Sequence, residues 1–355
     1  MRRLAQIALL VIAALVVGCS ESVVVRDTKP LYTPRYAKGF SIEQDKATGE
    51  KLLCIRNPWQ GAEDVLYYVE IDTIAPPQRI VAMSSSHAAM LDAVGCSDRI
   101  VGLSGCRFIY NNDLCKKIAE GEIAEVGYDS AFDFEKIRSL KADVVLLYGV
   151  AGEARTITDK LDELCIPYIY IGDYIESSPL GKAEWIVAIA AICGVQRVGE
   201  EYFVALEERY NALKQSAAQY TVRPKVMLNT PYNDSWFMPS VRSYAVQLIA
   251  DAGGEYIYPQ NDSAESKPIS LEQALLLAST ADVWINVGQI SSLNQLKSEN
   301  PKFSTVPAVV NRRVYNNTKR TTESGGSDFW EGGTVNADIV LADMIKLLHY
   351  NAPTD

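Results

Sequence analysis

Histidine is scarce in this chain, whose 355 residues include only His87 and His349. Protein sites for bare zinc or manganese ions usually combine several imidazoles with carboxylates, so two histidines disfavour such a site. Enzyme signatures are missing as well, since no G-x-S-x-G elbow, G-x-G-x-x-G turn or phosphate-binding loop occurs. The sequence therefore favours a protein that is not an enzyme, with no catalytic residues, no directly bound metal and no cofactor.

Positive charge is also in deficit. Thirty-four Lys and Arg stand against 44 Asp and Glu, which gives a formal net charge of −10. A chain this acidic has no basic face for a nucleic acid, and we exclude nucleic acid as a partner. With 48% hydrophobic residues, the composition is that of a globular protein with a sizeable core and about two domains.

Long apolar runs are missing except at the start of the chain. Arg2 and Arg3 precede a run from Leu4 to Val17 that contains only one polar residue and is too short to span a bilayer comfortably. Such a run is typical of a signal peptide, and its end, VVGC, resembles a bacterial lipobox. We expect residues 1–18 to be cleaved and Cys19 to carry lipid, which would anchor the protein to a bacterial membrane in the periplasm or at the cell surface. A plain signal peptide or a short membrane anchor is the alternative.

Cysteines do not occur at metal-binding spacing. Export permits disulfides, but several cysteines sit among apolar residues at predicted helix ends, where buried fillers are expected. Pairing of Cys106 with Cys115 is left open. The six cysteines after the lipobox are Cys54, Cys96, Cys106, Cys115, Cys165 and Cys193.

The order of predicted elements indicates an α/β fold. Residues 20–38 have the composition of a tether, and residues 39–73 predict two or three antiparallel strands. From Arg79 on, apolar strands alternate with amphipathic helices, which predicts mostly parallel sheets. Residues 197–220 predict one helix on the order of 30 Å long. We therefore expect two Rossmann-like lobes joined by that helix, with bounds of 19–78 for the tether and β-rich extension, 79–196 for the first lobe and 221–355 for the second.

Ligand candidates follow from the strand ends. In open parallel sheets, ligands bind beyond the carboxyl ends of the strands, where loops and helix N-termini converge. His87 opens a predicted helix, so a capping or packing role is an alternative for this residue. The side chains at these ends that we expect to contact a ligand are Ser85, His87, Arg107, Tyr148, Tyr232, Trp236 and Arg320.

A family resemblance is carried by three segments, RIVAMSSSHAAMLDAVGCSDRIVGLSG, EVGYDSAFDFEKIRSLKADVVLLYG and SLEQALLLASTADVWINVG. In this order they resemble ABC-transporter substrate-binding lipoproteins for iron–siderophore complexes, haem and cobalamin. The resemblance covers residues 79–350 and implies two lobes joined by a rigid helix. It also places Trp330 on a loop that faces the cleft, and we expect Tyr128 there too. Two departures are the additional residues 39–73 and a first loop that reads SSSH where members often have Ser-Pro.

The resemblance also implies a role for Glu135 and Glu272. Each stands in the first turn of a predicted helix, at equivalent places in the two lobes. Family members use such residues to dock onto Arg residues of a dimeric permease, which works with an ATPase. The local alternative is stabilisation of the helix dipole, a contribution of roughly 0.3–1 kcal/mol.

The expected ligand is a small-molecule metal chelate. Tyr and Trp faces stack on flat organic groups, and Arg or Lys forms charge-assisted hydrogen bonds with anionic ones. Tyr is also a possible axial ligand of haem iron. We favour an iron–siderophore complex, with a corrinoid such as cobalamin or with haem as alternatives. A sensory or adhesive lipoprotein that reuses the fold is a further alternative, because fold does not determine function.

Overall fold

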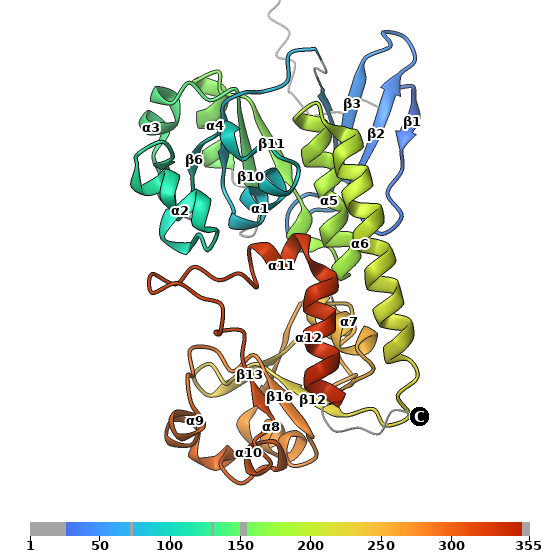
Figure 1. Ribbon diagram of the computed structural model, residues 1–355, viewed down its shortest axis with the longest axis vertical. Coiled ribbons are helices and arrows are strands. Elements are labelled where there is room, and N and C mark those ends of the chain that lie inside the picture. Colours follow the sequence, from blue (N-terminus) through green and yellow to red (C-terminus); the bar gives the residue numbers. More distant parts are fainter. Residues whose placement is uncertain (1–25, 72–73, 129–130, 150–154, 264, 350–355) are drawn as a thin grey trace, which may run out of the picture.

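The computed structural model describes residues 26–71, 74–128, 131–149, 155–263 and 265–349. The predicted signal peptide and Cys19 lie outside these residues. Figure 1 shows two α/β lobes, one above the other, with an additional antiparallel sheet beside the upper lobe. No helix in the described part of the chain combines the length and the apolar character needed to cross a membrane.

The upper lobe, here called the N-lobe, is built on a five-stranded sheet of order β11-β10-β5-β6-β7, in which every pair is parallel. The first four residues of its strand VVLLY are buried, as expected for a parallel sheet with both faces covered. The strands are β5 (Ile80–Ala82), β6 (Ile100–Leu103), β7 (Ala124–Glu125), β10 (Val144–Tyr148) and β11 (Tyr168–Ile171), with a small hairpin of β8 (Gly127–Tyr128) and β9 (Ala131–Phe132). The helices are α1 (Ser85–Ala93), α2 (Asn112–Ala119), α3 (Phe134–Ser139), α4 (Arg155–Glu163) and α5 (Pro179–Ile192), with short 3₁₀ helices η1 (Ser97–Arg99), η2 (Cys106–Phe108) and η3 (Asp173–Ile175).

The lower lobe, here called the C-lobe, repeats the plan with a four-stranded parallel sheet of order β14-β12-β16-β17. An antiparallel pair, β13 with β15, lies beside it and was not predicted from the sequence. The strands are β12 (Lys225–Leu228), β13 (Ser235–Met238), β14 (Glu255–Tyr256), β15 (Lys267–Ser270), β16 (Val283–Ile285) and β17 (Val314–Tyr315). The helices are α7 (Tyr244–Asp251), α8 (Leu271–Ala278), α9 (Leu293–Glu299), η4 (Pro301–Phe303), α10 (Pro307–Val310), α11 (Gly332–Val335) and α12 (Ala337–His349).

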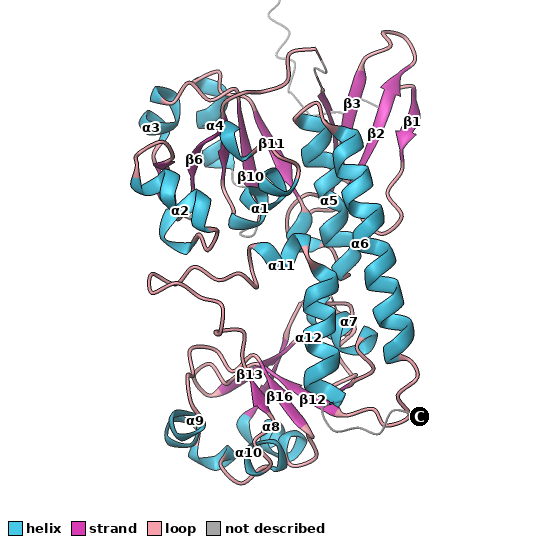
Figure 2. Cartoon of the chain, in the orientation of Figure 1, coloured by secondary structure: helices cyan, strands magenta, loops and turns pink. Residues whose placement is uncertain are grey.

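Two long helices form the spine beside the lobes, as Figure 2 shows. Helix α5 is apolar on all sides and almost wholly buried, which makes it a core helix. The linking helix expected over 197–220 is α6 (Gln196–Ala217), which packs against α5 at one end and α12 at the other. Its C-terminal half is tied to the C-lobe by the Tyr210 hydroxyl, which donates to Asp251 at 2.7 Å. The predicted α/β class with two lobes and one long helix is confirmed.

The β-rich extension is larger than predicted. It has four antiparallel strands, β1 (Thr28–Tyr32), β2 (Phe40–Asp45), β3 (Lys51–Arg56) and β4 (Leu66–Glu70), so the segment interpreted as a tether contains a strand. The buried carboxylate of Glu184 on α5 holds the extension in place. This carboxylate accepts hydrogen bonds from the backbone N–H groups of Arg35, Tyr36 and Ala37 at 2.7–2.8 Å. The extension is therefore fastened to the N-lobe and the spine.

A second connection between the lobes follows β17. Residues 316–331, here called the strap, run from the C-lobe towards the N-lobe and continue into α11, after which α12 returns beside the C-lobe (Figure 1). Helix α11 packs against α1 and α5 of the N-lobe. The strap has no helical or strand periodicity, and the sequence had predicted two of its residues, Arg320 and Trp330, as ligand contacts.

Candidate ligand-binding site

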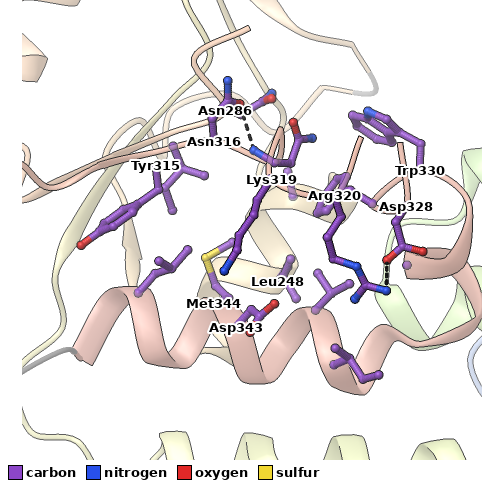
Figure 3. Close-up of a pocket in the computed structure, with 18 of the residues that line it drawn as sticks. Leu248, Asn286, Tyr315, Asn316, Lys319, Arg320, Asp328, Trp330, Asp343 and Met344 are labelled. Atoms are coloured by element: carbon purple, nitrogen blue, oxygen red, sulfur yellow. Dashed lines mark hydrogen bonds and ion pairs between the residues drawn. The ribbon is translucent and has the colours of Figure 1, made fainter. Parts of the chain in front are cut away.

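A cavity of about 590 Å³ lies beyond the carboxyl ends of three C-lobe strands. Leu228, Ile285 and Tyr315, the last residues of β12, β16 and β17, all line it. We call it the strand-end pocket. Leu248 of α7 and Met344 of α12 add apolar surface to its wall (Figure 3). Its position agrees with the general location of ligand sites in open parallel sheets, and its volume suits a small organic ligand.

The strap supplies the charged and aromatic part of this pocket. Lys319, Arg320 and Trp330 line it from the strap, and all three side chains are exposed, Trp330 by 54%. The Arg320 guanidinium pairs with Asp328 at 2.8 Å, which fixes its direction (Figure 3). A hydrogen bond with Tyr110, reinforced by Asp328, raises the pKa of Arg320 above its usual value, so it is a permanent cation.

Amide groups complete the pocket wall. Asn286 follows β16 and adopts a left-handed backbone with φ 61°, a conformation that Asn tolerates better than most residues. Its side-chain amide donates to Asn229 at 2.7 Å. Asn316 donates to the Gly288 carbonyl at 2.7 Å, which orders the start of the strap. Asn286 and Asn316 were not predicted as site residues, although the strand ends at which they lie were predicted to form the site.

The strap is anchored to the N-lobe by one buried carboxylate. Glu331, only 2% exposed, accepts hydrogen bonds from the backbone N–H groups of Tyr110 at 2.7 Å and Asn111 at 2.8 Å. Gly326 lies so close to Ile109 that an added Cβ would be 2.4 Å from the Ile109 carbonyl oxygen. Burial raises the pKa of Glu331, although the two N–H donors oppose the shift. The pocket is thus assembled from C-lobe strands and a strap whose far end is fixed to the N-lobe.

Exposed tyrosines gather at the carboxyl ends of the N-lobe strands. Tyr148 ends β10, is 37% exposed and packs on Tyr174 with ring centroids 4.9 Å apart. Tyr128, 55% exposed, packs on Phe108 at 5.2 Å, and the Arg107 guanidinium lies 4.4 Å from the centre of the same Phe108 ring. Partial burial raises the pKa of Tyr148 above its usual value. These side chains offer aromatic faces, hydroxyl groups and one cation.

Two predicted ligand contacts are wrong because their side chains are fully buried. Trp236 lies on β13, donates its indole N–H to the Leu228 carbonyl at 2.8 Å and packs against Trp284 and Phe303. It belongs to the C-lobe core.

His87 is the second correction. It is fully buried on α1, with Nε2 3.5 Å from Asp173 Oδ1 and its ring edge against Tyr148. Lys182 Nζ is 3.8 Å from the other Asp173 oxygen. Burial by itself would raise the pKa of Asp173, but His87 and Lys182 together hold it below its usual value. His87 therefore packs against Tyr148 in the interior and is not exposed to a ligand.

Three further residues predicted to contact a ligand lie near strand ends and are at least partly accessible. Ser85 is half-buried at the first turn of α1, Tyr232 is 70% exposed on the turn after β12, and Arg107 is exposed. Of the predicted ligand residues, only Arg320 and Trp330 line the strand-end pocket. Cys106 and Cys115 are both free thiols in the structure. Within the described ranges, no cluster of three or more His, Cys, Asp or Glu side chains is arranged to hold a metal ion.

Comparison with known proteins identifies the family. The sequence model of the periplasmic binding protein family matches residues 80–321, which is more than half of the chain. The chain belongs to the periplasmic binding protein family. An uncharacterized lipoprotein of Methanocaldococcus jannaschii is 31% identical over 287 residues, an alignment that covers 78% of this chain and 66% of the relative. The chain thus spans just under two thirds of that relative's length.

Solved structures of several binding proteins share the fold. The periplasmic vitamin B12-binding protein of Vibrio cholerae has a TM-score of 0.55 at 15% identity, covering 78% of this chain and 98% of that one. A periplasmic haem-binding protein of Pseudomonas aeruginosa has a TM-score of 0.59 at 16% identity, with coverage of 78% and 94%. An ABC-transporter substrate-binding protein of Listeria monocytogenes has a TM-score of 0.57 at 18% identity, with coverage of 78% and 100%. At these identities the likeness shows the fold alone.

Proposed function

We propose that this periplasmic binding protein captures an organic metal chelate, an iron–siderophore complex, and delivers it to the permease of an ABC importer. The observation that carries the proposal is the strand-end pocket, where the apolar ends of three strands lie beside Lys319, Arg320 and Trp330. An apolar wall suits the organic shell of a chelate, the cations suit its anionic groups, and the indole suits stacking.

A haem or a corrinoid is the second candidate ligand, and a specific observation favours it. Tyr128 and Tyr148 present exposed phenol rings at the strand ends of the N-lobe. A tyrosine oxygen is an established axial ligand of haem iron. The aromatic faces of both residues would also stack on a flat macrocycle.

Spectroscopic titration tests the proposal and separates the candidates. The purified protein is mixed in turn with ferric siderophores, haemin and cyanocobalamin, and both ligand absorbance and tryptophan fluorescence are followed. A saturable one-to-one change with a ferric siderophore is the expected result. Saturable binding of haemin or cyanocobalamin alone would identify that compound as the ligand in place of a siderophore and would leave the proposed transport function unchanged. Binding of none of the three would favour a sensory or adhesive role on this fold.

Permease docking is proposed for Glu135 and Glu272. Glu135 is exposed on α3 and Glu272 on α8, which lie in different lobes. The helix starts are already capped by other side chains, since Asp133 accepts from the Lys136 N–H at 2.8 Å and Ser270 from the Gln273 N–H at 3.2 Å. Hydrogen bonds from its own backbone N–H and from Ser270 lower the pKa of Glu272, which keeps it ionised. Exposed carboxylates at helix starts that other side chains already cap are available to arginines of a permease.

Membrane anchoring through Cys19 is proposed on the basis of the VVGC motif and of relatives named as lipoproteins. The protein would then act outside the cytoplasm, tethered to the membrane that holds its permease. Replacement Cys19→Ser should release the protein from the membrane fraction or block its processing. Unchanged fractionation together with normal processing would exclude the lipid anchor.

A further inference from the structure

A second cavity, of about 550 Å³, lies where the β extension meets both lobes. Helix α7 separates it from the strand-end pocket, because Tyr244 and Ala245 line the pocket whereas Gln247 lines the second cavity. We call it the junction crevice. The side chains that line it and matter here are Lys38, Arg56 and Asn57 of the extension, Glu176 and Ser177 of the N-lobe, and Arg242 and Gln247 of the C-lobe.

The junction crevice concentrates positive charge in an acidic protein. Lys38, Arg56 and Arg242 line it, and all three side chains are exposed. Arg56 is partly compensated by Glu43, whose carboxylate lies 3.3 Å from the guanidinium. Neither Lys38 nor Arg242 has an ion-pair partner among the residues that the structure describes. Three cations converge here in a chain with a net charge of −10.

One carboxylate, that of Glu176, also lines the crevice, and one of its two oxygens is occupied by hydrogen bonds. Glu176 is 6% exposed, and one oxygen accepts hydrogen bonds from the N–H groups of Lys38 at 2.8 Å and Gly39 at 2.9 Å. The Trp185 indole donates to the same oxygen at 3.1 Å. Glu176 therefore holds the extension to the N-lobe, and its interaction with Lys38 offsets part of the positive charge of the crevice.

The crevice also lies between parts that share no direct polar contact among the described residues. In the described chain, no hydrogen bond or ion pair links the extension strands β1–β4 to residues 225–315 of the C-lobe. Lys38 and Arg56 of the extension and Arg242 of the C-lobe line the same crevice, and a bound anion would reduce the repulsion between these like charges. The junction crevice thus has walls on three structural units, and cations outnumber carboxylates among the side chains that line it.

We infer that the junction crevice binds a small polyanion that carries at least two carboxylate or phosphate groups and bridges the extension to the C-lobe. Two arginine guanidinium groups match the paired oxygens of such groups, and the lysine adds a point charge. Asn57, Ser177 and Gln247 contribute neutral donors. This site is separate from the strand-end pocket, and the proposed binding of a polyanion does not depend on which chelate that pocket binds.

The test is calorimetric titration of the purified protein with citrate and with inorganic phosphate in a buffer of low ionic strength. The double variant Lys38→Gln, Arg242→Gln removes the two unpaired cations of the crevice. Its matched control, Lys29→Gln, Arg223→Gln, removes the same charges from exposed positions in the extension and just before β12 that do not line the crevice. Circular dichroism and thermal unfolding check that both variants fold like the parent.

We expect citrate to bind the parent and the control with equal affinity, and more tightly than phosphate does. Citrate should bind the crevice variant roughly tenfold more weakly or worse, because charge-assisted hydrogen bonds are lost. Added salt should weaken citrate binding to the parent. The inference is overturned if citrate does not bind the parent, or if it binds the crevice variant and the control equally. Chelate titration of the same variants should match the parent, and a loss of chelate affinity in the crevice variant alone would refute the separation of the two sites.

Discussion

The carboxylate of Glu331 accepts a hydrogen bond of 2.7 Å from the backbone N–H of Tyr110, although 221 positions separate the two residues in the sequence. This contact joins the end of the strap to the N-lobe, whereas the start of the strap follows a C-lobe strand. The strap also carries Arg320 and Trp330 into the strand-end pocket. The geometry of the proposed binding site therefore depends on a contact between the lobes.

Replacement Glu331→Gln should destabilise the folded protein. The amide retains one acceptor oxygen, so one of the two N–H groups of Tyr110 and Asn111 loses its partner in a buried place, which costs about 1–3 kcal/mol. Chemical denaturation of the parent and variant measures the difference in the free energy of unfolding. Glu323→Gln is the matched control, because Glu323 is exposed on the same strap. Equal stability of the two variants would show that the carboxylate does not hold the strap.

Asp173 should make the stability depend on pH in the acid range. Its folded pKa lies below the ordinary value of 3.8, so the stability it contributes is present above that value and is lost as the pH falls through the folded pKa. At neutral pH the variant Asp173→Asn should be less stable than the parent, since His87 and Lys182 lose a carboxylate partner.

The stability difference between the parent and Asp173→Asn should shrink as the pH is lowered from about 4, because the parent carboxyl becomes neutral as well. Urea denaturation over a series of pH values measures it. The exposed Asp234→Asn variant should follow the parent throughout. A gap between the parent and Asp173→Asn that is constant with pH would contradict the assignment.

Trp236 should behave as a core residue. Trp236→Ala removes a fully buried side chain that packs against Trp284 and Phe303, and large core truncations of this kind cost about 3–5 kcal/mol. Trp330→Ala removes a half-exposed indole and should cost far less. Thermal unfolding of the two variants side by side gives the comparison, and a Trp236→Ala variant as stable as Trp330→Ala would place Trp236 outside the core.

Sequence reasoning succeeded where a feature is local. The buried strands were recognised because an apolar run such as VVLLY needs no knowledge of its neighbours, and a cavity lies at strand ends, where the sequence predicted the site. The direction in which a side chain points, however, depends on contacts with distant parts of the chain. Trp236 and His87 both follow strands, where a ligand contact was expected. Trp236, however, lies on β13 with its side chain in the core, and His87 is buried against Tyr148. The strap contact of Glu331 joins residues too far apart in the sequence for any local pattern to reveal.

Docking by Glu135 and Glu272 should be visible in transport and not in stability. Reversal of either to Lys should leave chelate binding intact and shift the free energy of unfolding by about half a kcal/mol or less, because both side chains are exposed. Uptake by cells should fall for each single variant and further for the double variant, since the new cations would repel permease arginines. Full uptake by Glu135→Lys, Glu272→Lys would show that these carboxylates only stabilise their helices.

The central claim is that the strand-end pocket binds the chelate through its strap residues. Fluorescence titration of the parent, Arg320→Ala and Trp330→Ala with the ferric siderophore that binds the parent tests it most directly. Lys297→Ala, an exposed cation of α9 that does not line the pocket, is the control. We predict that both strap variants lose roughly tenfold or more in affinity at nearly unchanged thermal stability, whereas the control binds like the parent. Parent-like affinity in both strap variants would contradict the account.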